Sequence, residues 1–143
     1  MSRAEVREAT EADAAALVPL LDELGYPSEE KAVARRLATL AADKASDLWI
    51  AERDGTAVGF VSTYVNALVT RDARLCRITA MAVATEAQGA GVGRALIDRV
   101  EQEARRAGCD RIEVTSAHRR TEAHAFYERL GFEATSRRFI REI

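Results

Sequence analysis

The chain has 143 residues, a length that suits one domain and can bury a core without disulfide or metal staples. Its 48% hydrophobic and 31% charged residues describe an ordinary globular protein, and the net charge of −2 gives no strong attraction to nucleic acid or membranes. No apolar run reaches the length of a membrane span and residues 1–11 are too charged for a signal peptide, so we expect a cytoplasmic protein.

The N-terminal segment predicts a short edge strand followed by a helix. Residues 5–9 alternate as a strand does, and Thr10 with Asp13 has the spacing of a capping box. Gly25 suits the position after the last helical turn, because glycine adopts a left-handed conformation easily. The apolar face between these signals has helical spacing and consists of Leu17, Leu20, Leu21 and Leu24.

A second helix and a β-hairpin come next. Ser28 is the expected cap of this helix, whose apolar face contains Val33, Leu37 and Leu40. Residues 48–52 predict a strand, and the tetrapeptide 53–56 contains Asp-Gly, a strong hairpin-turn signal. Residues 57–65 are the expected partner strand, and residues 75–83 the strand after it.

A glycine-rich turn, residues 88–94, lies between the strand that ends at Val83 and a helix expected over residues 95–107. Free backbone N–H groups and the dipole at a helix start attract anions, and glycines let the backbone approach a ligand closely. We therefore expect a phosphate-bearing cofactor here. The turn lacks the lysine of a P-loop, and no reading of its glycines fits the dinucleotide pattern Gly-x-Gly-x-x-Gly.

The remaining elements complete an α/β protein with a mixed sheet. The helix after the glycines has a helical apolar face, made of Val92, Leu96, Val100 and Ala104. We expect a strand at 111–115, a helix at 122–130 and two short final strands at 132–134 and 137–140. Residues 1–143 contain no repeat and no linker, which predicts a single domain.

Two motifs resemble those of the GNAT superfamily of N-acetyltransferases. Gln88-x-x-Gly91-x-Gly93 is similar to the loop that binds the pyrophosphate of acetyl-CoA in that family. Residues 123–132 are similar to its segment A-x-x-F/L-Y-x-x-x-G-F, in the same order along the chain. The resemblance implies a mixed, mostly antiparallel sheet flanked by about four helices, and a cytoplasmic enzyme that moves an acetyl group from acetyl-CoA to an amine.

The cofactor would be held mainly by backbone groups. The resemblance implies that the strand before the loop pairs its main chain, around Met81 and Val83, with the pantetheine arm. A backbone N–H of residues 81–83 would also stabilise the thioester oxygen, while the side chains of Met81 and Val83 pack in the core. The expected pyrophosphate cradle consists of the N–H groups of Gln88, Gly89, Ala90, Gly91, Val92, Gly93 and Arg94.

Proton transfer needs an acid for the leaving thiolate and a base for the amine. A tyrosine hydroxyl stays protonated at neutral pH and can donate, and Tyr127 stands where many GNAT enzymes have such a tyrosine. The alternative for Tyr127 is an amphipathic core residue. Residues 75–83 contain no acid, unlike many family members, so Glu52, Glu86 or water are the open choices for the base.

The remaining arginines and cysteines do not identify the acceptor or a protein partner. Arg119 and Arg120 could contact the 3′-phosphate of CoA or form a solvated basic turn. Cys76 and Cys109 lack a CxxC spacing, which indicates reduced thiols, and no metal-ligand pattern is present. We expect a small-molecule or peptide amine as acceptor, and neither nucleic acid nor membrane as partner. The oligomeric state is left open, with a homodimer as one possibility. The alternative to an enzyme is a non-catalytic acyl-CoA-binding sensor or partner module.

Overall fold

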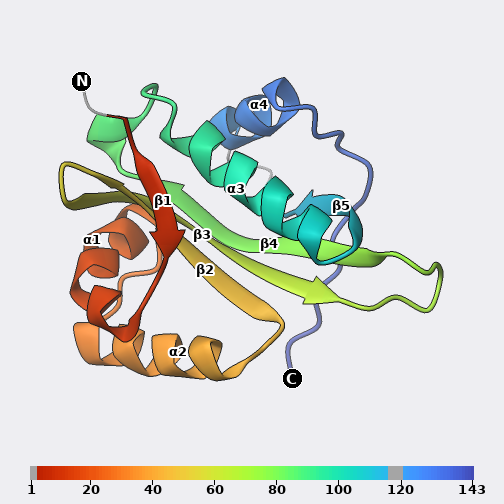
Figure 1. Cartoon of the computed structure of the whole chain (residues 1–143), viewed down its shortest axis with the longest axis horizontal. Helices are drawn as coiled ribbons and strands as arrows, with labels where there is room; N and C mark the ends of the chain where they lie inside the picture. The colour runs from red at the N-terminus through yellow and green to blue at the C-terminus, as the bar shows by residue number, and fades with distance from the viewer. Residues whose placement is uncertain (1–2, 116–120) are drawn as a thin grey trace. The chain divides into compact units, whose positions relative to one another are not determined.

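Figure 1 shows a computed structural model of the protein, which describes residues 3–115 and 121–143. The chain divides into two compact units, a first that ends at Glu113 and a second that begins at Val114. The first unit contains nearly the whole sheet with helices α1, α2 and α3, and the second contains helix α4. Arg119 and Arg120, which the sequence suggests as phosphate contacts, lie outside the described residues.

A five-stranded sheet organises the first unit, with its strands in the order β1-β2-β3-β4-β5. Neighbouring strands from β1 to β4 are antiparallel. Helix α3 joins β4 to its neighbour β5, as a crossover helix does between parallel strands, so the sheet is mixed and mostly antiparallel as expected. The strands are β1 (Glu5–Glu8), β2 (Ser46–Arg53), β3 (Thr56–Asn66), β4 (Arg74–Val83) and β5 (Cys109–Val114).

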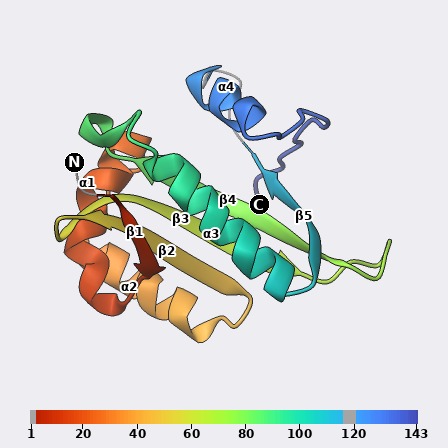
Figure 2. The ribbon, with the colours of Figure 1, turned by 45° about the horizontal axis from the view of Figure 1, so that its top comes forward.

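Helices cover both faces of this sheet. In both views α1 and α2 lie on one face and α3 on the other (Figures 1 and 2). The predicted apolar face of α3 is confirmed, because Val92, Leu96, Val100 and Ala104 are all buried. The helices are α1 (Ala14–Leu24), α2 (Glu30–Ala42), α3 (Val92–Arg106) and α4 (Thr121–Arg129), with short 3-10 turns η1 (Glu11–Asp13) and η2 (Thr85–Ala87).

Several local predictions are confirmed. Thr10 and Asp13 form the capping box, here around η1 at the entrance to α1. Gly25 ends α1 in the left-handed conformation, with φ of 102°. Asp54 and Gly55 turn the β2–β3 hairpin with φ of 54° and 78°, as a two-residue turn with both central residues left-handed requires.

Two predictions are wrong. The cap residue of α2 is Glu29, because the Ser28 hydroxyl donates to the Tyr26 carbonyl and accepts from Arg36 instead. Residues 132–134 and 137–140 form no strand: they are irregular, with Phe139 91% exposed. A strand needs a neighbouring backbone to pair with, and a short apolar pattern does not reveal whether one is available.

Gly59 on β3 allows α3 to approach the sheet closely. A Cβ atom at this position would lie 2.9 Å from the carbonyl oxygen of Ala82, 3.1 Å from a Val92 methyl carbon and 3.2 Å from a Leu96 methyl carbon. Distances this short leave no room for a side chain. The first turn of α3, and with it the glycine-rich turn before it, is therefore positioned by the absence of a side chain on β3.

Candidate functional site

The glycine-rich turn joins the end of β4 to the start of α3, as the sequence predicts. After Val83 the chain makes the 3-10 turn η2, and Gly89 and Gly91 then adopt φ of 82° and 83°. Only glycine adopts this conformation without strain, which explains the residue type at both positions. Gly91 is the cap residue of α3, and having no side chain it leaves the first turn of that helix open.

Five backbone donors of this turn have no partner among residues 3–115 and 121–143. Within the described residues, no hydrogen bond uses the N–H groups of Gly89, Gly91, Val92, Gly93 and Arg94. The first turn of α3 contains no acidic residue, and it carries the exposed Arg94. Free N–H groups, the helix dipole and a cation together make a site for an anion.

The other backbone donors of the turn form hydrogen bonds that stabilise the turn itself. The N–H of Gln88 donates to the Thr85 carbonyl at 3.3 Å, and the N–H of Ala90 donates to the Ala87 carbonyl at 3.3 Å. The Gln88 side chain donates to the carbonyl of Val83 at 3.3 Å, which ties the turn back to the end of β4. Of the seven N–H groups expected to form the cradle at residues 88–94, five are thus left without a partner in the part of the chain that the structure describes.

The end of β4 directs some of its backbone groups away from β3. The N–H of Ala84 donates to the Val58 carbonyl on β3 at 2.8 Å. Successive residues of a strand direct their backbone groups to opposite sides, so the N–H and C=O of Met81 and Val83 point away from β3. The Val83 carbonyl bonded to Gln88 agrees with this direction. Thr79, opposite no residue of β3, forms a β-bulge just before this stretch, and bulges are frequent beside active sites.

Tyr127 lies in the second unit, on α4, within a small aromatic cluster. Its ring meets those of Phe126 and Phe132 edge to face, at centroid distances of 5.3 and 5.5 Å. Its carbonyl accepts the N–H of Phe132 at 3.0 Å, which fixes the chain just after the helix. Tyr127 is half-buried, so its ring packs as an amphipathic core residue does, and its role as an acid stays a prediction.

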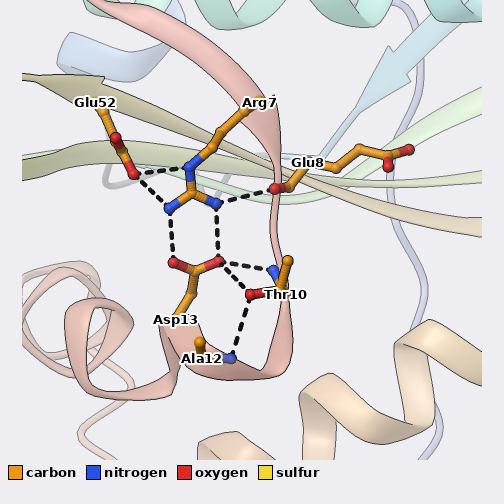
Figure 3. Close-up of polar contacts among 6 residues, drawn as sticks. All are labelled: Arg7, Glu8, Thr10, Ala12, Asp13 and Glu52. Carbon is orange, nitrogen blue, oxygen red and sulfur yellow. Dashed lines mark hydrogen bonds and ion pairs between the residues drawn. The ribbon is translucent and has the colours of Figure 1, made fainter. Parts of the chain in front are cut away.

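Glu52, one candidate for the base, is held in an ion-pair network (Figure 3). The Arg7 guanidinium donates to Glu52 through Nε at 2.7 Å and also through Nη2. The same guanidinium binds both carboxylate oxygens of Asp13, at 2.7 and 2.9 Å. The pKa of Asp13 is held below its usual range, chiefly by the hydrogen bond from Arg7. Glu52 is therefore part of a clamp between β1, β2 and η1.

The other candidate base, Glu86, is exposed in η2 and has no hydrogen bond within the described residues.

Sequence reasoning missed the clamp around Arg7, since Asp13 is recognisable only as a helix cap and Glu52 is 45 residues from Arg7. It also missed a contact between Glu23 on α1 and Thr85 at the start of η2.

A cavity of about 160 Å³ lies elsewhere, between the sheet and the second half of α3. Asp47, Thr63 and Cys76 line it from the sheet and Glu103 from the helix, and no residue of the glycine-rich turn does. The backbone donors without a partner among the described residues lie at the turn, away from this cavity. Over residues 3–115 and 121–143, no three side chains gather as metal ligands and no helix has the length and apolar character to cross a membrane.

The acetyltransferase (GNAT) family model matches residues 14–132. The chain belongs to the GNAT family of acetyltransferases. It is 33% identical to aminoglycoside N(6′)-acetyltransferase type 1 of Stenotrophomonas maltophilia, over 92% of this chain and 88% of that protein. It is 27% identical to aminoalkylphosphonate N-acetyltransferase of Salmonella typhimurium strain LT2, over 97% of this chain and 91% of that protein.

The fold of this GNAT protein is also similar to solved structures. A crystal structure named as a transcriptional regulator from Bacillus halodurans C-125 has a TM-score of 0.90 at 25% identity, over 99% of this chain and 100% of that one. The expected family and α/β fold are thereby confirmed, and with them the activity class: the protein is an acetyl-CoA-dependent N-acetyltransferase.

Proposed function

We propose that this GNAT enzyme transfers the acetyl group of acetyl-CoA directly to the primary amine of a small molecule. The amine nitrogen forms a bond to the thioester carbonyl carbon, and the tetrahedral intermediate collapses as the C–S bond breaks. CoA leaves as a thiolate and takes up one proton, while the nitrogen loses one. No covalent intermediate on the protein is needed.

The observation that supports this proposal most is the group of unpartnered N–H donors at the start of α3. They would bind the cofactor's pyrophosphate, with Arg94 adding positive charge. The outward-facing backbone of Met81 and Val83 would receive the pantetheine arm and place an N–H near the thioester oxygen. One preorganised donor of this kind can lower the barrier by about 3 kcal/mol.

For proton transfer we propose Tyr127 as the acid that protonates the CoA thiolate. The base is Glu86 or water, because Glu52 is engaged by Arg7.

Both units would work together as one domain over residues 1–143. This proposal is supported by the family match, which includes residues of both units.

The acceptor class follows from what the relatives have in common. One is named for an aminoglycoside and the other for an aminoalkylphosphonate, acceptors that share an amine and differ in the rest of the molecule. We propose a small amine on this ground and hold peptide amines as the second group to test. One protein of similar fold is named as a transcriptional regulator, and a non-catalytic acyl-CoA-binding module is the alternative against which the enzyme is tested.

The deciding experiment combines acetyl-CoA calorimetry with a thiol-release assay on the same sample. The amine panel contains aminoglycosides, aminoalkylphosphonates and short peptides with free amino groups. Binding with thiol release for a small amine is the expected result. Binding without release for any amine would favour the non-catalytic module, and absence of binding would refute the cofactor assignment.

A further inference from the structure

Glu23, in the last turn of α1, has a position that its own helix does not explain. A carboxylate at the C-terminal end of a helix is repelled by the negative end of the dipole, and this turn contains no basic residue to compensate. Glu23 is exposed, so it does not contribute to the apolar face either. Its interaction partner lies on another element.

That partner is Thr85, the first residue of η2. The Thr85 hydroxyl donates to Glu23 Oε1 at 3.0 Å, and the Thr85 N–H approaches Glu23 Oε2 at 3.4 Å. The residue before this turn, Ala84, provides no side-chain cap. Glu23 thus caps η2 from a helix that is 62 residues away in the sequence (Figure 2, where the turn before α3 lies beside the end of α1).

The contact is continuous with the glycine-rich turn. Thr85 accepts the N–H of Gln88 through its carbonyl, and the Gln88 side chain in turn donates to Val83. Gln88 is followed directly by Gly89, the first of the residues with a free N–H group. A displacement of Thr85 therefore moves the residues that the proposed cofactor would contact.

We propose that Glu23 is a positioning residue for acetyl-CoA: by holding Thr85 it fixes the turn at residues 88–94 in the conformation that receives the pyrophosphate. This inference rests on the proposed function. Glu23 is also followed by Leu24, the last residue of α1, and then by residues 25–29, which join α1 to α2, so the contact links this connection to the cofactor turn.

The test is calorimetric titration of acetyl-CoA into the full chain and its variants. Glu23→Ala is expected to weaken binding by about three- to tenfold, the size of one exposed charge-assisted hydrogen bond. Thr85→Val should weaken binding similarly and Thr85→Ser should retain it, because serine keeps the hydroxyl. In the double variant Glu23→Ala with Thr85→Val the two losses should be less than additive, since both remove the same interaction.

Asp22→Ala is the matched control. It removes the same charge from the same helical turn, but the Asp22 side chain is exposed and has no hydrogen bond within the described residues. It should leave the affinity for acetyl-CoA unchanged. In turnover assays, Glu23→Ala should raise the KM for acetyl-CoA with little change in kcat, whereas general loss of structure would lower kcat and the melting temperature together.

The outcomes separate the two proposals. Wild-type binding with unchanged affinity in Glu23→Ala, or with an equal loss in Asp22→Ala, overturns the positioning role and leaves the proposed function standing. A wild-type protein that does not bind acetyl-CoA refutes the proposed function, and the positioning role with it.

Discussion

Replacing Gly59 with alanine tests whether the absence of a side chain on β3 positions α3. The added carbon would lie 2.9 Å from the Ala82 carbonyl oxygen, a backbone atom that moves only with β4. Overpacking a tight core costs about 1–3 kcal/mol, and alanine recovers about 0.5–1 kcal/mol of backbone entropy relative to glycine in a strand. The difference between these two terms is about 0–2.5 kcal/mol. Because the 2.9 Å contact is with a backbone atom and not with the end of a flexible side chain, we expect a cost in the upper part of the overpacking range and a net loss of about 1–2 kcal/mol in the free energy of unfolding.

Urea unfolding and thermal melting measure this loss directly. For a chain of this size the melting temperature should fall by about 3–8 °C, and Gly59→Val should lower it further. Because the added carbon also lies 3.1 Å from a Val92 methyl carbon, Val92→Ala should relieve part of the strain. The cost of the double variant should therefore be smaller than the sum of the single costs.

A Gly59→Ala variant as stable as the wild type would refute the steric reasoning, as would strictly additive costs with Val92→Ala. Acetyl-CoA affinity gives a second readout, since displacement of the first turn of α3 should weaken binding by more than the loss of stability alone explains. A destabilised variant with wild-type affinity would separate the packing of α3 from the proposed cofactor site.

Three further predictions concern single residues. Gly91→Glu should leave the protein folded but less stable by about 1–2 kcal/mol, because any side chain is strained at the φ of 83° found there, although nothing lies within 4 Å of the added carbon. Calorimetry should detect no acetyl-CoA binding by this variant, since the carboxylate faces the pyrophosphate, and unchanged affinity would remove the turn from the site. Tyr127→Phe should lower kcat by about 100-fold or more with little effect on the KM for acetyl-CoA, and an unchanged kcat would exclude the acid role. Arg7 lowers the pKa of Asp13 in the folded protein, so the stabilisation from their pair is complete above the usual carboxylate pKa of about 4 and is lost as pH falls through the lowered folded value. The difference in unfolding free energy between wild type and Asp13→Asn should therefore disappear in acid. A difference that does not depend on pH would contradict this.

The features that sequence reasoning predicted correctly depend on residues close together in the chain. The capping box spans four residues, the Asp54-Gly55 turn two, and the buried face of α3 repeats every helical turn. In each case the physical cause, a cap, a left-handed conformation or one apolar face, acts over a few residues. Local patterns were therefore sufficient.

The features that it missed or misjudged depend on distant partners. Arg7 meets Glu52 across 45 positions and Glu23 meets Thr85 across 62, so neither contact leaves a local pattern. The expected strands at 132–134 and 137–140 failed for the same reason, because a strand is defined by a partner that may lie anywhere in the chain. Ser28 is the local exception, since Arg36 and the Tyr26 carbonyl compete for its hydroxyl.

The same distinction separates the two halves of the proposed site. The cofactor half uses backbone N–H groups, which every residue except proline has. The left-handed conformation of the turn leaves these groups available, and the glycines at positions 89 and 91 indicate that conformation in the sequence. The proton-transfer half uses side chains, whose type shows only which chemistry is available. Glu52 has the chemistry of a base, yet Arg7 turns its carboxylate into part of a structural clamp. A glycine pattern can therefore predict a binding turn from sequence, whereas a catalytic carboxylate is identified only when its partners are known.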